Sequence, residues 1–474
     1  TGVFIAGHWR EATGGGTFTV ADPGTGKPLT RVADGQAEDA VAALDAAVGA
    51  QESWAGTPAR ERGEILRRAW QLMVDRADDL ALLMTLEMGK SLAESRAEVT
   101  YAAEFFRWFG EEAVRIEGRW ATNPAGGSRL LTMKQPVGPC LLITPWNFPL
   151  AMGTRKIGPA IAAGCTMVVK PAQLTPLSML VLTDLLTEAG LPSGVLNIVP
   201  SASAGKTVAP LMSDSRLRKV SFTGSTPVGR KLMAQASANL LRVSMELGGN
   251  APFLVFADAD LEAAVEGAVV AKMRNNGESC VAANRFHVAE SVAEEFTDRL
   301  TVRMAELKLG HGAEDGTDVG PLIDDDQRTI VVDLVADAVT KGATVRTGGI
   351  TPEGDGFYYP PTVLSDVPAD ARILREEVFG PVAPVTTFGS EAQALALANG
   401  TEFGLVAYVF TDDLRRAIRV AEGLQTGMVG LNTGLVSNAS APFGGVKSSG
   451  FGREGGNEGI EEYLSLKYVS LSMG

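Results

Sequence analysis

The stretch PCLLITPWNFPLAMGTRKIGPAIAAGCTMVVKPA, residues 139–172, decides the fold. Residues 140–143 form an apolar run that is typical of a fully buried strand, and residues 166–169 form a second such run. Between them, residues 152–163 have the spacing of a helix. A strand, a helix and a second strand in this order predict two parallel strands joined by a helical crossover.

The same alternation continues downstream. Further expected elements are a helix over 178–189, strands over 195–199 and 219–222, and a helix over 228–236. Together they predict a doubly wound parallel sheet of the Rossmann-like, dinucleotide-binding kind. Strands near 243–245 and 252–256 are expected to start a second α/β unit, which helices such as 291–307 and 325–341 extend to about residue 430.

Three further regions complete the expected architecture. Residues 1–35 read as short strands between turns, and residues 37–116 read as helical, with breaks at 56–58 and 88–90. Residues 118–136 read as an extended ribbon, and residues 464–471 alternate apolar and polar side chains as an edge strand does. An exposed terminal strand needs a partner, which is either the ribbon or another subunit, so we expect a homodimer or homotetramer.

Composition narrows the classes of function. A chain of 474 residues predicts two or three domains, and its net charge of −14 disfavours nucleic acid and anionic membranes as partners. The absence of a long apolar run and of a basic, apolar leader predicts a cytoplasmic protein. Cys140, Cys165 and Cys280 are widely spaced, which argues against a disulfide framework. The three histidines show no ligand spacing, so we expect no metal site.

Candidate binding residues follow the strands, because ligands of open parallel sheets bind beyond the carboxyl ends of the strands. Asn147 follows the first strand and offers an amide donor, although an Asx turn would also explain it. Lys170 and Gln173 follow the second strand. The segment TGSTPVG, 223–229, leads into a helix that favours anions at its N-terminus, but it is not a GxGxxG motif.

A cysteine and a glutamate stand out as candidates for chemistry. Cys280 follows Asn275-Asn276-Gly277, residues that adopt positive φ at low cost, so the thiol is expected on a sharp turn after a helix that ends at residue 273. Asp258 and Asp260 are expected as N-caps of that helix. Glu246, at the end of an apolar strand, is expected to have a raised pKa, which suits a general base. Taken singly, Cys280 also reads as a small buried thiol, and Glu246 as a hydrogen-bonded carboxylate.

Six motifs in order resemble the NAD(P)-dependent aldehyde dehydrogenase superfamily over essentially the whole chain. They are PWNFP at 145–149, KPA at 170–172, FTGST at 222–226, MELGG at 245–249, the Cys280 turn, and EEVFGP at 376–381. The resemblance implies that Cys280 is the nucleophile, that Glu246 is the general base, and that Asn147 stabilises the oxyanion. It also implies a set of cofactor-binding residues: Thr144, Trp146, Lys170, Pro171, Ala172, Gln173, Gly224, Ser225, Leu247, Glu377 and Phe379.

Other segments resemble the succinate-semialdehyde dehydrogenase branch of this superfamily. They are LEMGKSLAESR at 86–96, GLVSN at 434–438, APFGGVKSSG at 441–450 and GIEEYL at 459–464. In that branch two arginines and a serine hold the free carboxylate of the substrate, and the matching positions are Arg155, Arg274 and Ser437. Ordinary salt bridges would be the alternative explanation of the two arginines.

Several alternatives remain open. Glutarate or 2-oxoglutarate semialdehyde would fit the same carboxylate-binding residues, because the sequence does not give the depth of the pocket. A cofactor-free cysteine hydrolase is disfavoured by the scarcity of histidine, and a non-catalytic binding or structural protein by the joint presence of Cys280, Glu246 and Asn147.

The sequence departs from many relatives at two positions. NAD-preferring relatives often carry Glu where this chain has Gln173, and Gln does not repel a 2′-phosphate, so NADP is slightly favoured over NAD. Some relatives carry a second cysteine at the position of Ala282, and its absence predicts no local disulfide control of Cys280.

The expected domains combine these patterns. Residues 1–117 and 137–245, with 431–455 returning, are expected to form the cofactor-binding domain, and 246–430 the catalytic domain. Residues 118–136 and 456–474 are expected to form a small β element for oligomerisation.

Overall fold

The largest sheet has eight strands, in a computed structural model that describes residues 2–473. Its five parallel strands are, in spatial order, β11 (Arg242–Glu246), β10 (Lys219–Thr223), β7 (Cys140–Ile143), β8 (Met167–Lys170) and β9 (Leu196–Ile198). Antiparallel strands flank them, with β19 (Gly450–Phe451) beside β11, and β1 (Val3–Ile5) and β2 (His8–Arg10) beyond β9. The predicted doubly wound parallel sheet is confirmed.

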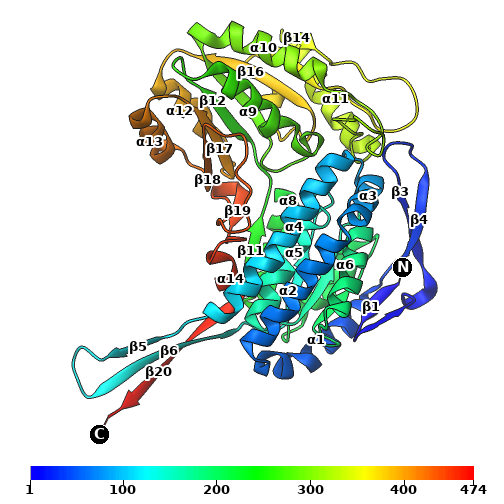
Figure 1. Ribbon diagram of the computed structural model, residues 1–474, viewed down its shortest axis with the longest axis vertical. Coiled ribbons are helices and arrows are strands. Elements are labelled where there is room, and N and C mark those ends of the chain that lie inside the picture. Colours follow the sequence, from blue (N-terminus) through cyan, green and yellow to red (C-terminus); the bar gives the residue numbers. More distant parts are fainter. Residues whose placement is uncertain (1, 474) are drawn as a thin grey trace.

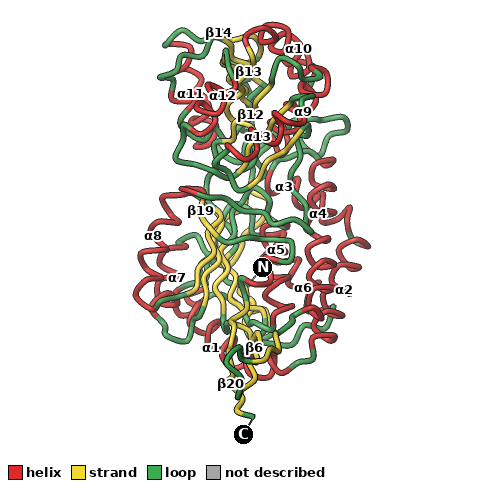
Figure 2. The backbone as a smooth tube through the Cα atoms, turned by 90° about the vertical axis from the view of Figure 1, so that its left-hand side faces the viewer, coloured by secondary structure: helices red, strands yellow, loops and turns green. Residues whose placement is uncertain are grey.

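Helices cover both faces of this sheet (Figure 2). One face carries α1 (Ala37–Gly56), α7 (Ala204–Ser213) and α8 (Thr226–Ala236). The other carries α2 (Ala59–Asp75), α3 (Ala77–Met88), α4 (Leu92–Glu112), α5 (Ala151–Ala163) and α6 (Leu177–Glu188). Every residue of α5 is buried, because it lies between the sheet and the helices α2 and α4. The helix that directly follows β7 is therefore held rigidly on both sides.

A second sheet of seven strands forms the other main part of the molecule, at the top of Figure 1. Its strands are, in spatial order, β14 (Thr344–Thr347), β15 (Thr362–Ser365), β16 (Val382–Phe388), β13 (Ala283–Ala289), β12 (Ala251–Val255), β17 (Val406–Phe410) and β18 (Met428–Leu431). All neighbours are parallel except β14 and β15. Its helices are α9 (Leu261–Met273), α10 (Ala293–Glu306), α11 (Asp325–Thr340), α12 (Glu391–Asn399) and α13 (Leu414–Gly423).

A three-stranded arm projects from the first part of the molecule (Figure 1). It consists of β5 (Arg119–Thr122), β6 (Ser128–Pro136) and β20 (Leu464–Ser472), and the short helix α14 (Glu458–Glu461) precedes β20. The C-terminal strand pairs with β6 along its whole length, antiparallel. A separate hairpin, β3 (Thr17–Ala21) and β4 (Pro28–Ala33), lies near the N-terminus.

The structure corrects three expectations about elements. The strand at 243–245 does not start the second unit, because β11 pairs with β10 in the first sheet. The helix α7 was not predicted, since Gly205 and Pro210 interrupt its pattern. A break between α2 and α3 at Arg76 was also missed, because no Gly or Pro marks it.

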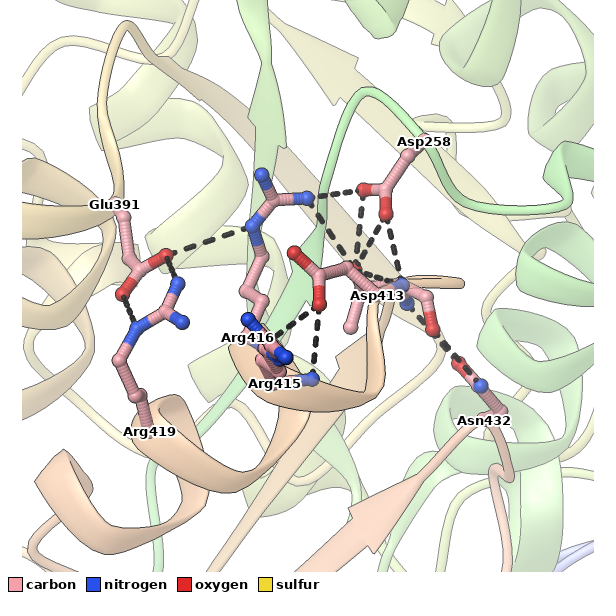
Figure 3. A network of polar contacts seen from close by, with 8 residues as sticks. Asp258, Glu391, Asp413, Arg415, Arg416, Arg419 and Asn432 are labelled. Atoms are coloured by element: carbon pink, nitrogen blue, oxygen red, sulfur yellow. Dashed lines mark hydrogen bonds and ion pairs between the residues drawn. The ribbon is translucent and has the colours of Figure 1, made fainter.

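The two aspartates before α9 have different roles. Asp260 is the N-cap, and its carboxylate accepts hydrogen bonds from two backbone amides of the first turn. Asp258, expected as a second cap, instead accepts hydrogen bonds from the hydroxyl of Thr411 at 2.8 Å and from the amide of Asp413 at 3.0 Å. It also pairs with Arg416, so it ties the start of α9 to that of α13 (Figure 3).

Candidate active site

The turn that carries Cys280 follows α9 directly. Asn275 and Asn276 both have φ of 58°, and Gly277 has φ of 78°. A side chain at Gly277 would collide with the carbonyl of Gly380, so this position needs glycine for space as well as for conformation. The turn leaves Cys280 partly exposed, while Asn275 and Asn276 are buried.

Hydrogen bonds join this turn to the loop after β7. The side-chain amide of Asn147 donates to the carbonyl of Glu278 at 3.0 Å, and that of Asn275 donates to the carbonyl of Asn147 at 2.9 Å. An amide nitrogen carries two hydrogens, so Asn147 keeps one donor for a further partner. The turn and the loop are thereby locked together although they are distant in sequence.

A buried ion pair supports the same loop. Lys90 pairs with Glu98, and its ammonium group also donates to the carbonyl of Asn147 at 2.9 Å. Glu98 in turn accepts hydrogen bonds from the amides of Leu150 and Ala151, both at 3.0 Å, at the start of α5. Sequence reasoning missed both residues as positioning groups. No local signal marks them, because the same segment also carries Glu87, Glu94 and Arg96.

A cavity of about 250 Å³ lies between the two main sheets, and Cys280 forms part of its wall. The other lining residues are Pro145, Trp146, Asn147, Thr223, Gly224, Ser225, Glu246, Leu247, Gly248, Gln327, Ile330, Glu377 and Phe379. The structure thus brings Cys280, Glu246 and Asn147 to one cavity, as the sequence predicts. With them it brings six of the expected cofactor-binding residues: Trp146, Gly224, Ser225, Leu247, Glu377 and Phe379.

Glu246 is buried at the end of β11, and neither of its carboxylate oxygens has a hydrogen-bond partner among residues 2–473. Burial raises the pKa of Glu246 well above its usual range, and the nearby Glu454 raises the pKa further. Such a carboxyl can take up a proton near neutral pH, and its free oxygens leave room for a water molecule.

Glu377 and Phe379 form the opposite wall of this cavity. Glu377 accepts a hydrogen bond from the amide of Gly249 at 3.1 Å, and burial raises its pKa to about 7. A Cβ at Gly248 would lie 2.9 Å from the Glu377 carboxylate, so only glycine leaves that carboxylate in place. The ring of Phe379 meets the ring of Trp146 edge-on at 5.3 Å.

The remaining expected cofactor-binding residues lie outside this cavity, at the carboxyl ends of β7 and β8. They are Thr144, Lys170, Pro171, Ala172 and Gln173. The ammonium group of Lys170 has no hydrogen bond or ion pair among residues 2–473, and burial lowers its pKa to about 8. Gln173 is exposed. Together with the N-terminus of α8, which directly follows Ser225, these groups fit a dinucleotide whose phosphates lie over the sheet end.

Cys280 also lines a second, much smaller cavity. Its wall contains Tyr101, Phe148, Met152, Arg155, Arg274, Ser279, Cys280, Val281, Ser437 and Phe443. Arg274 donates a hydrogen bond to the hydroxyl of Ser437 at 2.9 Å. The cavity measures about 10 Å³, which is room for about one water, so a larger ligand enters only when the lining side chains move apart.

The guanidinium group of Arg155 is held by an ion pair within the protein. It forms an ion pair with Glu454, which also pairs with Lys156, and all three side chains are buried. Its Nη2 atom has no hydrogen-bond partner among residues 2–473. The expected alternative of an ordinary salt bridge therefore holds for one side of Arg155, while the guanidinium keeps donors for a further acceptor.

Burial raises the pKa of the Cys280 thiol to about 12, although Arg155 opposes this shift. The other cysteines, Cys140 and Cys165, are fully buried, and all three are free thiols. Within residues 2–473 there is no cluster of His, Cys, Asp and Glu that could hold a metal ion. No helix of that range is long and apolar enough to cross a membrane.

This arrangement, a thiol between an acid-lined cavity and an arginine-lined one on two α/β units, defines an aldehyde dehydrogenase. The model of the aldehyde dehydrogenase family matches residues 9–469, and the chain belongs to this family.

Two curated relatives are similar to this chain over almost its whole length. A succinate-semialdehyde dehydrogenase of Paenarthrobacter nicotinovorans is 60% identical over 94% of this chain and 99% of its own length. A glutarate-semialdehyde dehydrogenase of Pseudomonas putida is 50% identical over 99% of this chain and 97% of its own. Among solved structures, a succinate-semialdehyde dehydrogenase from Burkholderia pseudomallei superposes with a TM-score of 0.98 at 48% identity, covering 100% of this chain and 98% of its own.

Proposed function

We propose that this protein oxidises succinate semialdehyde to succinate, with Cys280 as the nucleophile. The observation that carries the proposal is the position of Cys280 in the walls of both cavities, with Glu246 and Asn147 on one side and Arg155, Arg274 and Ser437 on the other. An aldehyde with a carboxylate at its far end would span the smaller cavity and reach the sulfur with its carbonyl carbon.

The chemistry of the site follows from these groups. Cys280 releases its thiol proton to solvent and attacks the aldehyde carbon as the thiolate. This forms a thiohemiacetal, whose oxyanion accepts hydrogen bonds from the free Asn147 amide hydrogen and from the Cys280 backbone amide. Bound NAD(P)⁺ would supply the hydride acceptor of the oxidation. The acyl group then remains on Cys280 as a thioester, and Glu246 removes a proton from the water that releases succinate.

The cofactor-binding residues fit NADP or NAD, with NADP slightly favoured. The ammonium group of Lys170 has no hydrogen-bond or ion-pair partner among residues 2–473, and Gln173 carries no charge, so neither repels a 2′-phosphate. A 49% identical relative from Escherichia coli is a succinate-semialdehyde dehydrogenase named for NADP(+), which supports this preference. Glu377 would hold the nicotinamide ribose, and Thr144, Pro171 and Ala172 would line the groove of the adenosine half.

Glutarate semialdehyde is the second candidate substrate, because a 50% identical relative is named for it. It is one methylene longer and presents the same carboxylate. A hydrophobic pocket discriminates one methylene by only about 10- to 200-fold, so both substrates are expected to react.

Three further assignments complete the proposal. The first sheet with its helices (1–117, 137–245 and 431–455) would bind the cofactor, and residues 246–430 would carry the nucleophile. The arm formed by 118–136 and 456–474 would join copies of the chain into a homodimer or homotetramer, because it exposes Trp120 and Tyr468, each at 59%. Three free thiols suit a reducing compartment, so the cytoplasm is the proposed location.

The test is an assay of cofactor reduction with succinate semialdehyde, glutarate semialdehyde and butanal, each with NADP and with NAD. We expect kcat/KM with succinate semialdehyde to exceed that with butanal by roughly a hundredfold or more, because a neutral aldehyde offers no acceptor to the remaining guanidinium donors of Arg155 and Arg274. NADP should give the higher kcat/KM of the two cofactors.

The control is Cys280→Ala, which should abolish turnover while NADP still raises the unfolding temperature, as any ligand of the folded state does. Appreciable turnover by Cys280→Ala would refute the assignment of the nucleophile. Equal kcat/KM with butanal and succinate semialdehyde would refute the assignment of the substrate.

A further inference from the structure

A buried hydroxyl group in the wall of the smaller cavity is without a hydrogen-bond partner among residues 2–473. Tyr101, on α4, contributes to the wall of that cavity, where Arg155, Arg274 and Ser437 also lie. Its hydroxyl oxygen is buried and forms no hydrogen bond with residues 2–473. A buried hydroxyl is ordinarily hydrogen-bonded in a folded protein, so this one calls for an acceptor that the protein does not provide.

The surroundings of this hydroxyl suit an anion. The guanidinium carbon of Arg274 lies 5.5 Å from the centroid of the Tyr101 ring. Burial raises the pKa of the Tyr101 phenol, and the lowering effects of Arg155, Arg274 and the nearby Ser437 hydroxyl are smaller, so the phenol keeps its proton at neutral pH. It is therefore a neutral donor beside two cations.

The ring is also held in place. It packs edge-on against Phe105 at a centroid distance of 5.0 Å, one helical turn further along α4. The helix α4 itself packs against α5, which carries Arg155. A donor fixed in this way loses little conformational freedom when it binds a ligand.

We propose that the Tyr101 hydroxyl donates a hydrogen bond to the carboxylate of the substrate and helps the enzyme to select carboxylated aldehydes. This inference rests on the proposed function. A carboxylate offers about four lone-pair sites, so it can accept from Arg155, Arg274 and Ser437 and still accept from Tyr101. A neutral aldehyde would leave the hydroxyl unpaired, which disfavours its binding.

The experiment replaces Tyr101 with Phe and measures kcat/KM with succinate semialdehyde and with butanal. It also measures the inhibition constant of succinate, which carries the carboxylate without the aldehyde. We expect kcat/KM with succinate semialdehyde to fall about ten- to a hundredfold and the inhibition constant to rise in the same range, because a hydrogen bond to a charged group is lost. Turnover of butanal should stay the same or improve, and the KM for NADP should not change.

A matched control is Tyr359→Phe. Tyr359 also has a buried hydroxyl without a partner, but it packs in an apolar cluster with Leu334 and Leu364 on the second sheet. This variant should leave every kinetic constant unchanged. Tyr101→Met, which also lacks the hydroxyl, should reproduce the loss of selectivity and guards against a folding defect of the Phe variant.

The outcomes separate the two proposals. If the unaltered protein does not favour succinate semialdehyde over butanal, the proposed function fails whatever Tyr101 does. If the unaltered protein has that preference but Tyr101→Phe keeps it, or loses activity with both aldehydes equally, Tyr101 is not a donor to the carboxylate.

Discussion

At the scale of single residues, the protonation of Cys280 reflects opposing influences. Burial disfavours the thiolate and raises the pKa to about 12, whereas Arg155 favours it. Glu377 and Glu246 oppose Arg155, because a second negative charge nearby disfavours the thiolate. In the protein without ligands, the thiol is therefore largely protonated at neutral pH.

This protonation predicts how the thiol reacts with an alkylating agent. Below the pKa the thiolate fraction rises tenfold per pH unit, so the rate of Cys280 modification by iodoacetamide should climb steadily up to at least pH 9. The measurement is loss of activity against time at each pH, without cofactor. The Cys280→Ala variant should take up no label, since Cys140 and Cys165 are fully buried. A plateau below pH 8 would contradict the raised pKa.

Residues differ in how well the sequence predicts them. Asn147, Glu246 and Cys280 each follow a recognisable strand or turn, and the structure brings all three to one cavity, although their catalytic roles stay predictions. Glu454 pairs with Arg155 across almost 300 positions of the chain, and no local pattern indicates such a pairing. No sequence pattern singled out Tyr101, because its unpaired hydroxyl is a property of the folded protein only.

At the scale of elements, the first turn of α9 is capped by one side chain, that of Asp260. The carboxylate of Asp260 accepts hydrogen bonds from the amides of Glu262 at 3.0 Å and Ala263 at 3.1 Å. We expect Asp260→Ala to lower the free energy of unfolding by about 1 kcal/mol, as measured by urea denaturation, with little effect on kcat. Kinetics should be spared because the nucleophile lies beyond the other end of the helix.

The comparison for this variant is Glu262→Ala. Glu262 is exposed in the same first turn and its side chain caps nothing, so its loss should cost less than about 0.5 kcal/mol. If the two variants lose equal stability, the cap does not hold α9 as described.

Elements with a strong local pattern were predicted well. The strand expected at 140–143 is β7, and the helix expected at 325–341 is α11, one residue shorter. The strand at 243–245 was also found, but its neighbour was wrong, since the pattern of a strand does not specify the strand beside it. The helix α7 was not predicted because its glycine and proline lower its helix propensity, although one of its faces is apolar.

At the scale of the whole molecule, the arm presents an apolar row across its three strands. Trp120 of β5 pairs with Leu131 of β6, and Leu131 pairs with Val469 of β20, so the three side chains share one face. The sequence left two partners open for the last strand, and the structure shows that the ribbon is one of them. Trp120 is 59% exposed, and in the proposed assembly this row would contact a second copy of the chain.

We expect Trp120→Glu to lower the mass of the assembly, because a charge on this row would be buried without a partner in a contact between copies. Sedimentation velocity measures that mass directly. Ile350→Glu is the control, since Ile350 is 80% exposed on a loop away from the arm. An unchanged mass in Trp120→Glu, or a single-chain mass in the unaltered protein, would contradict the proposed role of the arm.

The position of Cys280 in the walls of both cavities bears on the order in which substrate, cofactor and water would enter and leave the site. Because Cys280 lines both cavities, the aldehyde and the cofactor would reach its sulfur through different cavities. Neither molecule has to withdraw before the other can be exchanged. In the proposed reaction the larger cavity could thus exchange its contents while Cys280 carries the acyl group, and Glu246 in its wall would then meet the water that releases the acid.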